Sequence, residues 1–459
     1  MQPLITLLAV ITVLASLRIF FRIRQPSTPA WWAVKVFVTA PSPILLFAAL
    51  VCFLYGVSFS SPMISILSGI SVLTLFIHII KVTRSPDVVT GFAQAFGIRW
   101  ETRIHGGRRA SFLMSRMGFG LPVVVDPLLK KDIPFYTIPG TTRQLLCDVW
   151  EPSHTVGRSG LAFVYLHGSA WYLLDKDYGT RTFFRHLAAQ GHVIMDVAYR
   201  LFPETNMMGM VHDAKHAIAW MKANASAYGV NPARIVIGGG SAGGHIALLA
   251  AYTHRNKEFT PRDLEEIDTS VNSVIAMYGP PDLKALYYHT GQHLLSRKPV
   301  RRKKNKEGPG TIPKWVQKIL GDPHRLGMDK DFPEIGTLAA MFGGHPEELP
   351  EPYFRFSPVT HVHAGCPPTL FIQGEHDLIT PVQACLRFVT LLKQAGVPTV
   401  MHLLPQIDHA FDLIWPKVSP SAHNAYYDVE RFLGLMCEIE LTPATNPEKI
   451  ASNRLQRIA

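Results

Sequence analysis

The sequence predicts an α/β fold with a doubly wound, mostly parallel sheet and a cap insertion, preceded by N-terminal transmembrane helices. Three observations support this prediction. Apolar runs dominate the first 80 residues, and only 17% of the 459 residues are charged, below the ~25% usual for soluble proteins. From Pro134 onward, short apolar runs alternate with helical patterns, as in βαβ units. A glycine-rich segment at 239–243 stands between a strand pattern and a helix pattern.

Three membrane spans are expected in the first 80 residues. The stretch from Val36 to Ile80 contains no Lys, Arg, Asp or Glu, and its length is too great for one helical span and right for two. For the first apolar run a cleaved signal peptide is the alternative, but its arginines follow the run instead of preceding it. For the second stretch the alternative is a buried helical hairpin. The expected spans are about 4–21, 36–56 and 62–80, with a Gly-, Ser- and Pro-rich turn at 55–62.

Basic residues flank these spans on one side. By the positive-inside rule, everything after the third span faces the cytosol, and we expect a multi-pass protein of the endoplasmic reticulum membrane. If only two spans form, the following domain is lumenal. The flanking basic residues are Arg22, Arg24, Lys35, Lys81 and Arg84.

The remaining chain divides into a juxtamembrane connector (81–133), a catalytic α/β domain (134–437) and a tail (438–459). Within the domain the strand–helix alternation stops at about 281–352, which is the expected cap insertion. Strands are expected at 161–166, 192–197, 234–237, 271–277, 369–372 and 399–404, and helices at 182–190, 211–228 and 244–251.

The segment Gly239–Gly243 (GGSAG) matches the G-x-S-x-G pattern of a nucleophile elbow. Small residues such as Gly239 and Gly243 let the backbone turn sharply around Ser241, so that its hydroxyl projects from the sheet. A glycine-rich turn with an incidental serine is the alternative. The strand before it and the helix after it favour the nucleophile.

A serine nucleophile needs a base and an acid that orients the base, in the chain order Ser, Asp or Glu, His. Asp377 and His409 follow consecutive expected strands, where open α/β sheets place their active sites. Glu375 is the rival for the acid. His402 lies within a strand and is expected to be a packed or surface histidine.

Acyl transfer also needs backbone N–H groups that stabilise a developing oxyanion, each contributing about 2.7–4 kcal/mol. The segment HGSAW, which begins at His167, follows an expected strand, in the place where enzymes with a G-x-S-x-G elbow can carry an HGGG-type loop that supplies such N–H groups. The N–H of Ala242, directly after the nucleophile, is the second expected donor.

From about Pro134 to Leu435 the chain resembles the α/β-hydrolase superfamily, and within it the hormone-sensitive-lipase-like serine esterases. The resemblance is carried by HGSAW, YRLFPE, DAKHAIAW, NPARI, GGSAGGHIA, EHDL and DHAF. The pattern GGSAGGHIA also resembles kynurenine-formamidase-like and prenylcysteine-methylesterase-like enzymes. The resemblance implies a serine esterase with Ser241, Asp377 and His409 as its triad, and the N–H groups of Gly168, Ser169 and Ala242 as oxyanion donors.

The chain departs from the family pattern in two places, the HGGG loop and the residue before the nucleophile. Ser169 and Ala170 replace glycines of the HGGG loop, and Gly240 stands where the family usually has Asp. The expected function is cleavage of a lipophilic carboxylic ester. Alternatives are an amidase or formamidase, a catalyst of acyl transfer, cyclisation or condensation in natural-product biosynthesis, and a catalytically inactive binding protein. No metal or cofactor is expected, because the cysteines lack metal-ligand spacing.

The basic run 297–306 is expected to contact anionic lipid headgroups rather than nucleic acid; a solvated loop is the alternative. Trp171, Tyr172 and Phe202 are candidates for an acyl pocket or for the core. Asn224 begins a glycosylation sequon that we interpret as incidental. The basic residues of the run are Arg297, Lys298, Arg301, Arg302, Lys303, Lys304 and Lys306.

Overall fold

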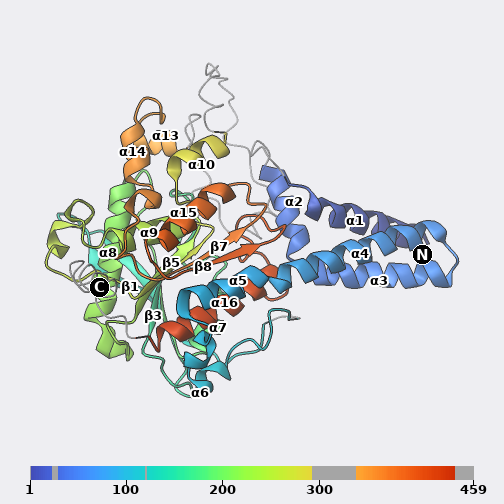
Figure 1. The fold of residues 1–459 in the computed structure, drawn as a ribbon, viewed down its shortest axis with the longest axis horizontal. Helices are drawn as coiled ribbons and strands as arrows, with labels where there is room; N and C mark the ends of the chain where they lie inside the picture. The colour runs from blue at the N-terminus through green and yellow to red at the C-terminus, as the bar shows by residue number, and fades with distance from the viewer. Residues whose placement is uncertain (1, 23–28, 119–120, 292–336, 440–459) are drawn as a thin grey trace, which may run out of the picture.

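In the computed structural model, which describes residues 2–22, 29–118, 121–291 and 337–439, one eight-stranded sheet forms the centre of the large domain (Figure 1). Its strand order is β1-β2-β4-β3-β5-β6-β7-β8. The predicted α/β class and mostly parallel sheet are confirmed, because the six strands from β3 to β8 pair in parallel. The strands are β1 (Leu128–Thr137), β2 (Gln144–Glu151), β3 (Ala162–Leu166), β4 (Val193–Val197), β5 (Ile235–Gly240), β6 (Ser273–Met277), β7 (Thr369–Gly374) and β8 (Thr399–Leu404).

The strands that the sequence reveals are those with both faces buried. Every residue of β3, β4, β5, β6 and β7 is buried, which explains their nearly continuous apolar runs. The antiparallel strands β1 and β2 were not predicted, and the sheet begins at Leu128 instead of Pro134. β1 is an edge strand with exposed Lys130 and Lys131, so it lacks the apolar run that marks a central strand.

Helices cover both faces of this sheet (Figure 1). Side chains of α8, α9 and α15 enter one hydrophobic core, and side chains of α5, α7 and α16 enter the other. The bounds are α5 (Pro86–Phe96), α6 (Gly106–Arg109), α7 (Arg181–Ala188), α8 (Met207–Ala223), α9 (Ala242–Tyr252), α15 (Val382–Gln394) and α16 (Pro420–Met436).

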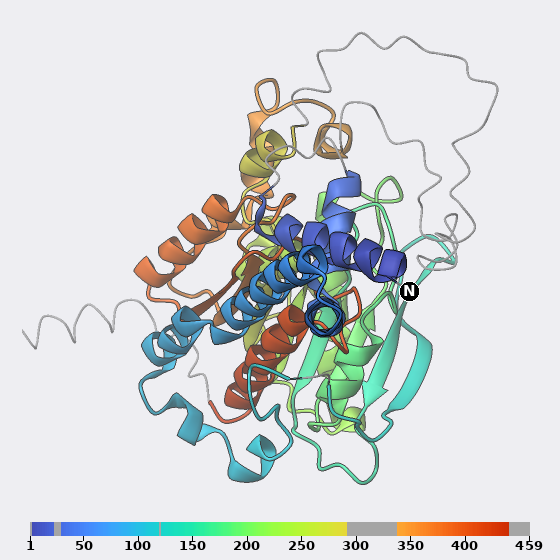
Figure 2. The ribbon, with the colours of Figure 1, turned by 90° about the vertical axis from the view of Figure 1, so that its right-hand side faces the viewer.

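The N-terminal helices extend from the domain as a separate bundle, which Figure 2 shows end-on. Two helical stretches, Gln2–Phe20 and Pro62–Phe96, are long and apolar enough to cross a membrane, and a bent pair raises the number to three. The bent pair replaces the helix expected over 36–56. Its halves meet at 71°, because Pro41 and Pro43 lack the N–H groups that a continuous helix needs. The helices are α1 (Gln2–Phe20), α2 (Pro29–Thr39), α3 (Ser42–Ser58) and α4 (Pro62–Arg84).

The expected cap region contains three short helices among its described residues: α10 (Leu283–His289), α13 (Thr337–Phe342) and α14 (Pro350–Arg355). The basic run 297–306 lies outside the described residues, as does nearly all of the expected tail. The predictions for these two segments therefore remain predictions.

Candidate active site

Ser241 occupies a sharp elbow between β5 and α9. Its backbone has φ 52° and ψ −122°, a conformation that L-residues rarely adopt and that recurs at functional sites. The neighbouring glycines permit the elbow to pack on β3. A Cβ atom on Gly239 or Gly243 would lie 2.2 Å or 2.0 Å from the carbonyl oxygen of Leu166. The close packing of strand and helix therefore explains why both positions lack side chains.

The structure brings Ser241, His409 and Asp377 together at the carboxyl ends of β5, β8 and β7. Ser241 Oγ lies 2.9 Å from His409 Nε2. His409 Nδ1 lies 2.9 Å from Asp377 Oδ2 and 3.2 Å from Asp377 Oδ1. Asp377 and His409 are buried, whereas Ser241 is half-buried. This arrangement can pass a proton from a serine hydroxyl to an imidazole whose other nitrogen is held by a carboxylate.

Three donors hold the carboxylate of Asp377 in place. The backbone N–H groups of Ile379 and Thr380 donate to Oδ1 at 2.8 Å and 2.7 Å. The amide of Gln373 donates to Oδ2 at 2.8 Å. The rival acid Glu375 lies elsewhere: its Oε2 accepts the N–H of Gln406 at 3.1 Å, and its side chain is 47% exposed.

Asp408 joins the two loops that carry Asp377 and His409, a role that the sequence reading missed. Its Oδ1 accepts the N–H of Leu378 at 2.9 Å and the N–H of His409 at 2.8 Å. Burial raises the pKa of Asp408, and the nearby Asp377 raises it further, while these two N–H groups oppose the shift. The only sequence signal was a carboxylate immediately before the histidine.

The HGSAW loop after β3 lies beside the elbow. A Cβ atom on Gly168 would lie 3.2 Å from the carbonyl oxygen of Gly240 and 3.5 Å from Ser241 Cβ. The Ser169 hydroxyl accepts the N–H of Trp171 at 2.9 Å and lies 2.7 Å from Tyr199 Oη, which donates to the carbonyl of His167 at 2.7 Å. Ser169 thus holds the loop shape through side-chain hydrogen bonds where the family pattern has glycine.

Two buried histidines support the loop and the elbow helix. His167 stacks on the ring of Tyr199 at 4.6 Å, and burial lowers its pKa to about 4. His245 accepts the indole N–H of Trp171 at 3.2 Å and donates to the carbonyl of Phe356 at 2.8 Å. Burial lowers the pKa of His245 to about 4 as well, so both rings are neutral at pH 7. Trp171 is itself 5% exposed and belongs to the core.

The departure at Gly240 has a packing explanation. A Cβ atom there would lie 2.8 Å from Tyr278 Oη. Tyr278 donates from that oxygen to Asp412, and its ring lies 4.6 Å from the ring of His409. An aspartate at position 240 would displace Tyr278, so glycine and tyrosine occupy this space as a pair.

Gly240→Ala is therefore expected to lower kcat about 10–100-fold. The added Cβ atom would displace Tyr278, against which the ring of His409 packs, and a shift of a catalytic group by about 1 Å lowers the rate by about this factor. Hydrolysis kinetics with purified full-length protein measure the effect. Gly106→Ala is the matched control, since a Cβ there meets nothing within 4 Å. Equal kcat values for the two variants would contradict the packing argument.

The N-terminal helices contact the loops that carry the candidate base and acid. The indole N–H of Trp32 on α2 donates to the carbonyl of His409 at 3.0 Å. Lys35 on the same helix contacts His376. His78 on α4 hydrogen bonds with Gln406 at 2.9 Å. The bundle therefore meets the domain at the same edge of the sheet as the site.

Trp32→Phe is expected to lower kcat about 2–10-fold with little change in KM, because it removes one hydrogen bond of about 0.5–1.5 kcal/mol to the His409 loop. Trp220→Phe, on α8, is the control that removes an indole N–H elsewhere. Measuring kcat and KM of both variants distinguishes loss of the hydrogen bond to the His409 loop from a general effect of losing an indole N–H group. A KM effect alone would point to substrate contact instead of loop positioning.

Other singled-out residues have structural roles. His402 is buried, with Nδ1 2.7 Å from Asp428 Oδ2, as expected for a packed histidine. The Asn224 side-chain amide donates to the carbonyl of Trp220 at 2.8 Å at the end of α8. All five cysteines are buried and free. Among the described residues, no group of three or more His, Cys, Asp and Glu side chains is placed to hold a metal ion.

Comparisons with known proteins agree with this architecture. Two family models match: BD-FAE over residues 147–308 and the prolyl oligopeptidase family over residues 324–434. The probable carboxylic ester hydrolase LipM of Mycobacterium tuberculosis is 31% identical over 288 residues, covering 62% of this chain and 57% of LipM. The isoprenylcysteine alpha-carbonyl methylesterase ICME of Arabidopsis thaliana is 29% identical over 183 residues, covering 40% of this chain and 41% of ICME.

Among solved structures, a thermophilic esterase from Thermogutta terrifontis has 21% sequence identity and a TM-score of 0.45, covering 66% of this chain and 91% of that chain. The chain spans less than two thirds of the length of the two curated relatives above, at 57% and 41%. By these matches the chain is similar to esterases of the α/β-hydrolase type.

Proposed function

We propose that this protein is a membrane-anchored serine hydrolase that cleaves a carboxylic ester of a lipophilic small molecule. The observation that carries the proposal is the chain of contacts from Ser241 Oγ to His409 Nε2 and from His409 Nδ1 to Asp377, each 2.9 Å long. The curated relatives support it, since their names describe a carboxylic ester hydrolase and a methylesterase.

In the proposed mechanism, Asp377 accepts the Nδ1–H of His409, so that Nε2 is free to take the Ser241 proton. The serine oxygen attacks the ester carbonyl and forms a tetrahedral intermediate. Its collapse breaks the carbon–oxygen bond, and His409 returns the proton to the departing alcohol. Water, deprotonated by His409, then attacks the acyl-enzyme and releases the carboxylic acid and free Ser241.

The oxyanion donors are the backbone N–H groups of Gly168, Ser169 and Ala242. Within the described part of the chain, none of these three N–H groups has a hydrogen-bond acceptor. Each free donor aimed at the developing oxyanion contributes about 2.7–4 kcal/mol. The Cβ atoms of Ser169 and Ala170 restrict the backbone dihedral angles of this loop relative to a glycine loop.

A membrane anchor and a lipophilic substrate are supported by the long apolar helices and by their contacts at the catalytic edge of the sheet. The basic residues Lys81 and Arg84 end α4 on the domain side, which by the positive-inside rule puts the domain on the cytosolic face. The endoplasmic reticulum is the proposed membrane, and anionic lipid contact through 297–306 belongs to the same proposal.

The test combines membrane extraction, active-site labelling and product analysis on the full-length protein. We expect resistance to carbonate extraction, labelling by a fluorophosphonate probe, and release of acid and alcohol from apolar esters. The Ser241→Ala variant is the negative control for labelling, because it lacks the nucleophile with which the probe reacts. A folded wild type that is not labelled would overturn the triad assignment. Labelling with product transferred to an acceptor alcohol, and no free acid, would favour acyl transfer over hydrolysis.

A further inference from the structure

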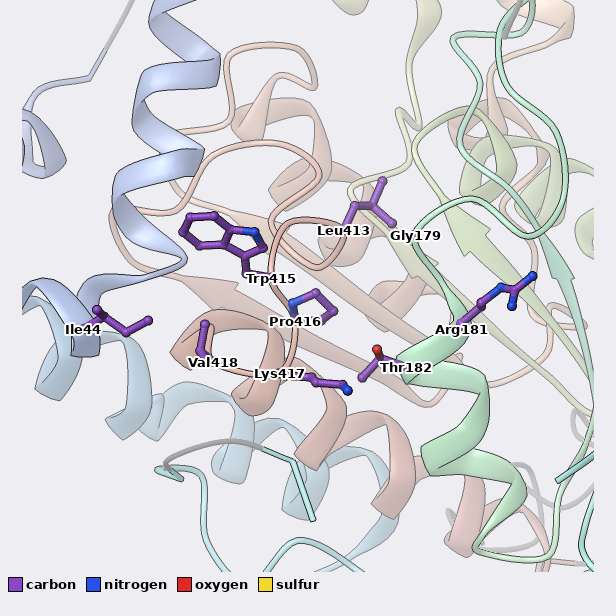
Figure 3. Close-up of a pocket in the computed structure, with 9 residues that line it drawn as sticks. All are labelled: Ile44, Gly179, Arg181, Thr182, Leu413, Trp415, Pro416, Lys417 and Val418. Carbon is purple, nitrogen blue, oxygen red and sulfur yellow. The ribbon is translucent and has the colours of Figure 1, made fainter. Parts of the chain in front are cut away.

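A groove lies where the first turn of α3 meets the loop that follows His409 (Figure 3). Its volume is about 630 Å³. One wall is the segment 413–418, a second wall is the start of α7, and Ile44 of α3 closes the third side. The groove therefore joins the proposed membrane anchor to the catalytic domain. Its lining residues are Ile44, Gly179, Arg181, Thr182, Leu413, Trp415, Pro416, Lys417 and Val418.

The apolar side of this groove continues a stripe of exposed side chains on α3. Ile44, Phe47, Val51 and Leu54 are all exposed apolar residues, and their spacing of three and four places them on one face of the helix. In a membrane anchor, such a face lies against lipid chains. The groove stands where this lipid-facing stripe reaches the domain.

Trp415 marks the depth of the groove relative to the bilayer. Its side chain is 53% exposed and meets Phe37 of α2 edge to face, with ring centroids 6.1 Å apart. Trp residues concentrate at membrane–water interfaces, where the indole has one apolar and one polar side. The first turn of α3 and Trp415 are therefore expected at the level of the lipid headgroups.

Cationic side chains line the opposite side of the groove. Lys417 is exposed and has no ion-pair partner in the described part of the chain. Arg181 pairs with Asp177. A second groove of about 440 Å³ adjoins the first, shares Arg181, Thr182 and Lys417, and adds Arg185. An apolar floor beside a cationic edge matches a lipid that has an acyl chain and an anionic headgroup.

We propose that this groove binds an anionic phospholipid of the host bilayer, with an acyl chain along Ile44 and the α3 stripe and the phosphate beside Lys417 and Arg181. The proposal rests on the membrane anchor of the proposed function but not on the triad. Bilayer lipid is the occupant because the groove continues a face that only lipid covers in an anchored protein, and because its charged edge is cationic.

Lipid retention tests the headgroup contact. The full-length protein is placed in nanodiscs of phosphatidylcholine with a minority of phosphatidylserine, and the lipid that stays bound on release is identified by native mass spectrometry. We expect phosphatidylserine to be retained in preference to phosphatidylcholine. Lys417→Gln is expected to weaken retention about fivefold, since one juxtamembrane Lys contributes about this factor. Lys393→Gln, an exposed lysine on α15, is the matched control.

Fluorescence quenching tests whether Trp415 lies against lipid at the level of the headgroups. Lipids brominated near the headgroup quench nearby indoles, so the wild type should lose more fluorescence than Trp415→Phe, which lacks the groove indole. Equal quenching of the two proteins would overturn the proposal. Equal retention by the Lys417→Gln and Lys393→Gln variants would also overturn it, as would cross-linking at position 44 or 415 that captures a second copy of the chain instead of lipid.

Failure of the groove proposal can be distinguished from failure of the proposed esterase function. Fluorophosphonate labelling of Ser241 in the same nanodiscs reports on the triad alone, because Trp415 and Lys417 contact no proposed catalytic group. Selective lipid retention without labelling would support the groove and remove the esterase proposal. If carbonate extracts the protein from the bilayer, both the groove proposal and the proposed membrane anchor are overturned.

Discussion

Replacement of Ser241 by alanine is expected to lower kcat by about 10⁶-fold, and replacement of His409 by alanine by a similar factor. The two groups act as one unit, since Ser241 Oγ is 2.9 Å from His409 Nε2, so the double variant should be no slower than either single one. Remaining activity comes from the oxyanion donors and from substrate binding. Burst and steady-state kinetics on an apolar ester measure these changes. Additive losses in the double variant would contradict a shared role.

The same experiment decides between the two acids. Asp377→Asn is expected to lower kcat about 10⁴-fold, because the amide holds the wrong tautomer of His409 while leaving the geometry intact. Glu375→Gln should stay within about twofold, since that side chain is half exposed and its recorded partners are Gln406 and His376. The reverse result would move the acid to Glu375.

Asp428→Asn is expected to lower the free energy of unfolding by about 3–5 kcal/mol, because it leaves the partly buried guanidinium of Arg116 without its counter-charge. Arg116 holds both oxygens of Asp428, at 2.7 Å and 2.6 Å, and His402 Nδ1 lies 2.7 Å from Oδ2. Asn424, one turn before Asp428, donates to Ser85 at the end of α4 at 2.8 Å. This cluster therefore fastens the connector and the anchor to α16.

Thermal unfolding in detergent measures this loss as a decrease in Tm on the order of 5–10 °C. Lys222→Gln is the control, because its partner Asp268 is 69% exposed and surface pairs contribute about 0–1 kcal/mol. An equal Tm for both variants would show that the cluster contributes little.

The pH dependence of this difference follows from the pKa of Asp428. Burial alone would raise that pKa, but His402 and Arg116 lower it below its ordinary value. A carboxyl whose pKa is depressed on folding contributes stability above its unfolded pKa of about 3.9 and loses it as the pH falls further. We expect the Tm gap between wild type and Asp428→Asn to be constant near neutral pH and to shrink below about pH 4.

Much of the sheet was predictable because its central strands are buried on both faces. Such strands must be apolar throughout, so segments such as 161–166 and 271–277 can be recognised without knowledge of their neighbours. The candidate triad was predictable for a related reason: the chemistry requires one residue type at each of three strand ends. The edge strand β1 escaped prediction because it is partly exposed to solvent, and the bend between α2 and α3 because two prolines interrupt an apolar run. Strand β2 lies between β1 and β4 and is mostly buried, so exposure does not explain why it was missed.

The sequence by itself therefore determined the α/β class, the apolar N-terminal helices, and Ser241, His409 and Asp377 as candidates, since each depends on local pattern or on residue chemistry. Only the tertiary structure decided which groups surround them. The contacts of Trp32, Asp408 and Tyr278 with the loops of the candidate site join residues 30 to 377 positions apart in the chain. No periodicity or motif records such contacts, because they arise when independent segments pack against one another.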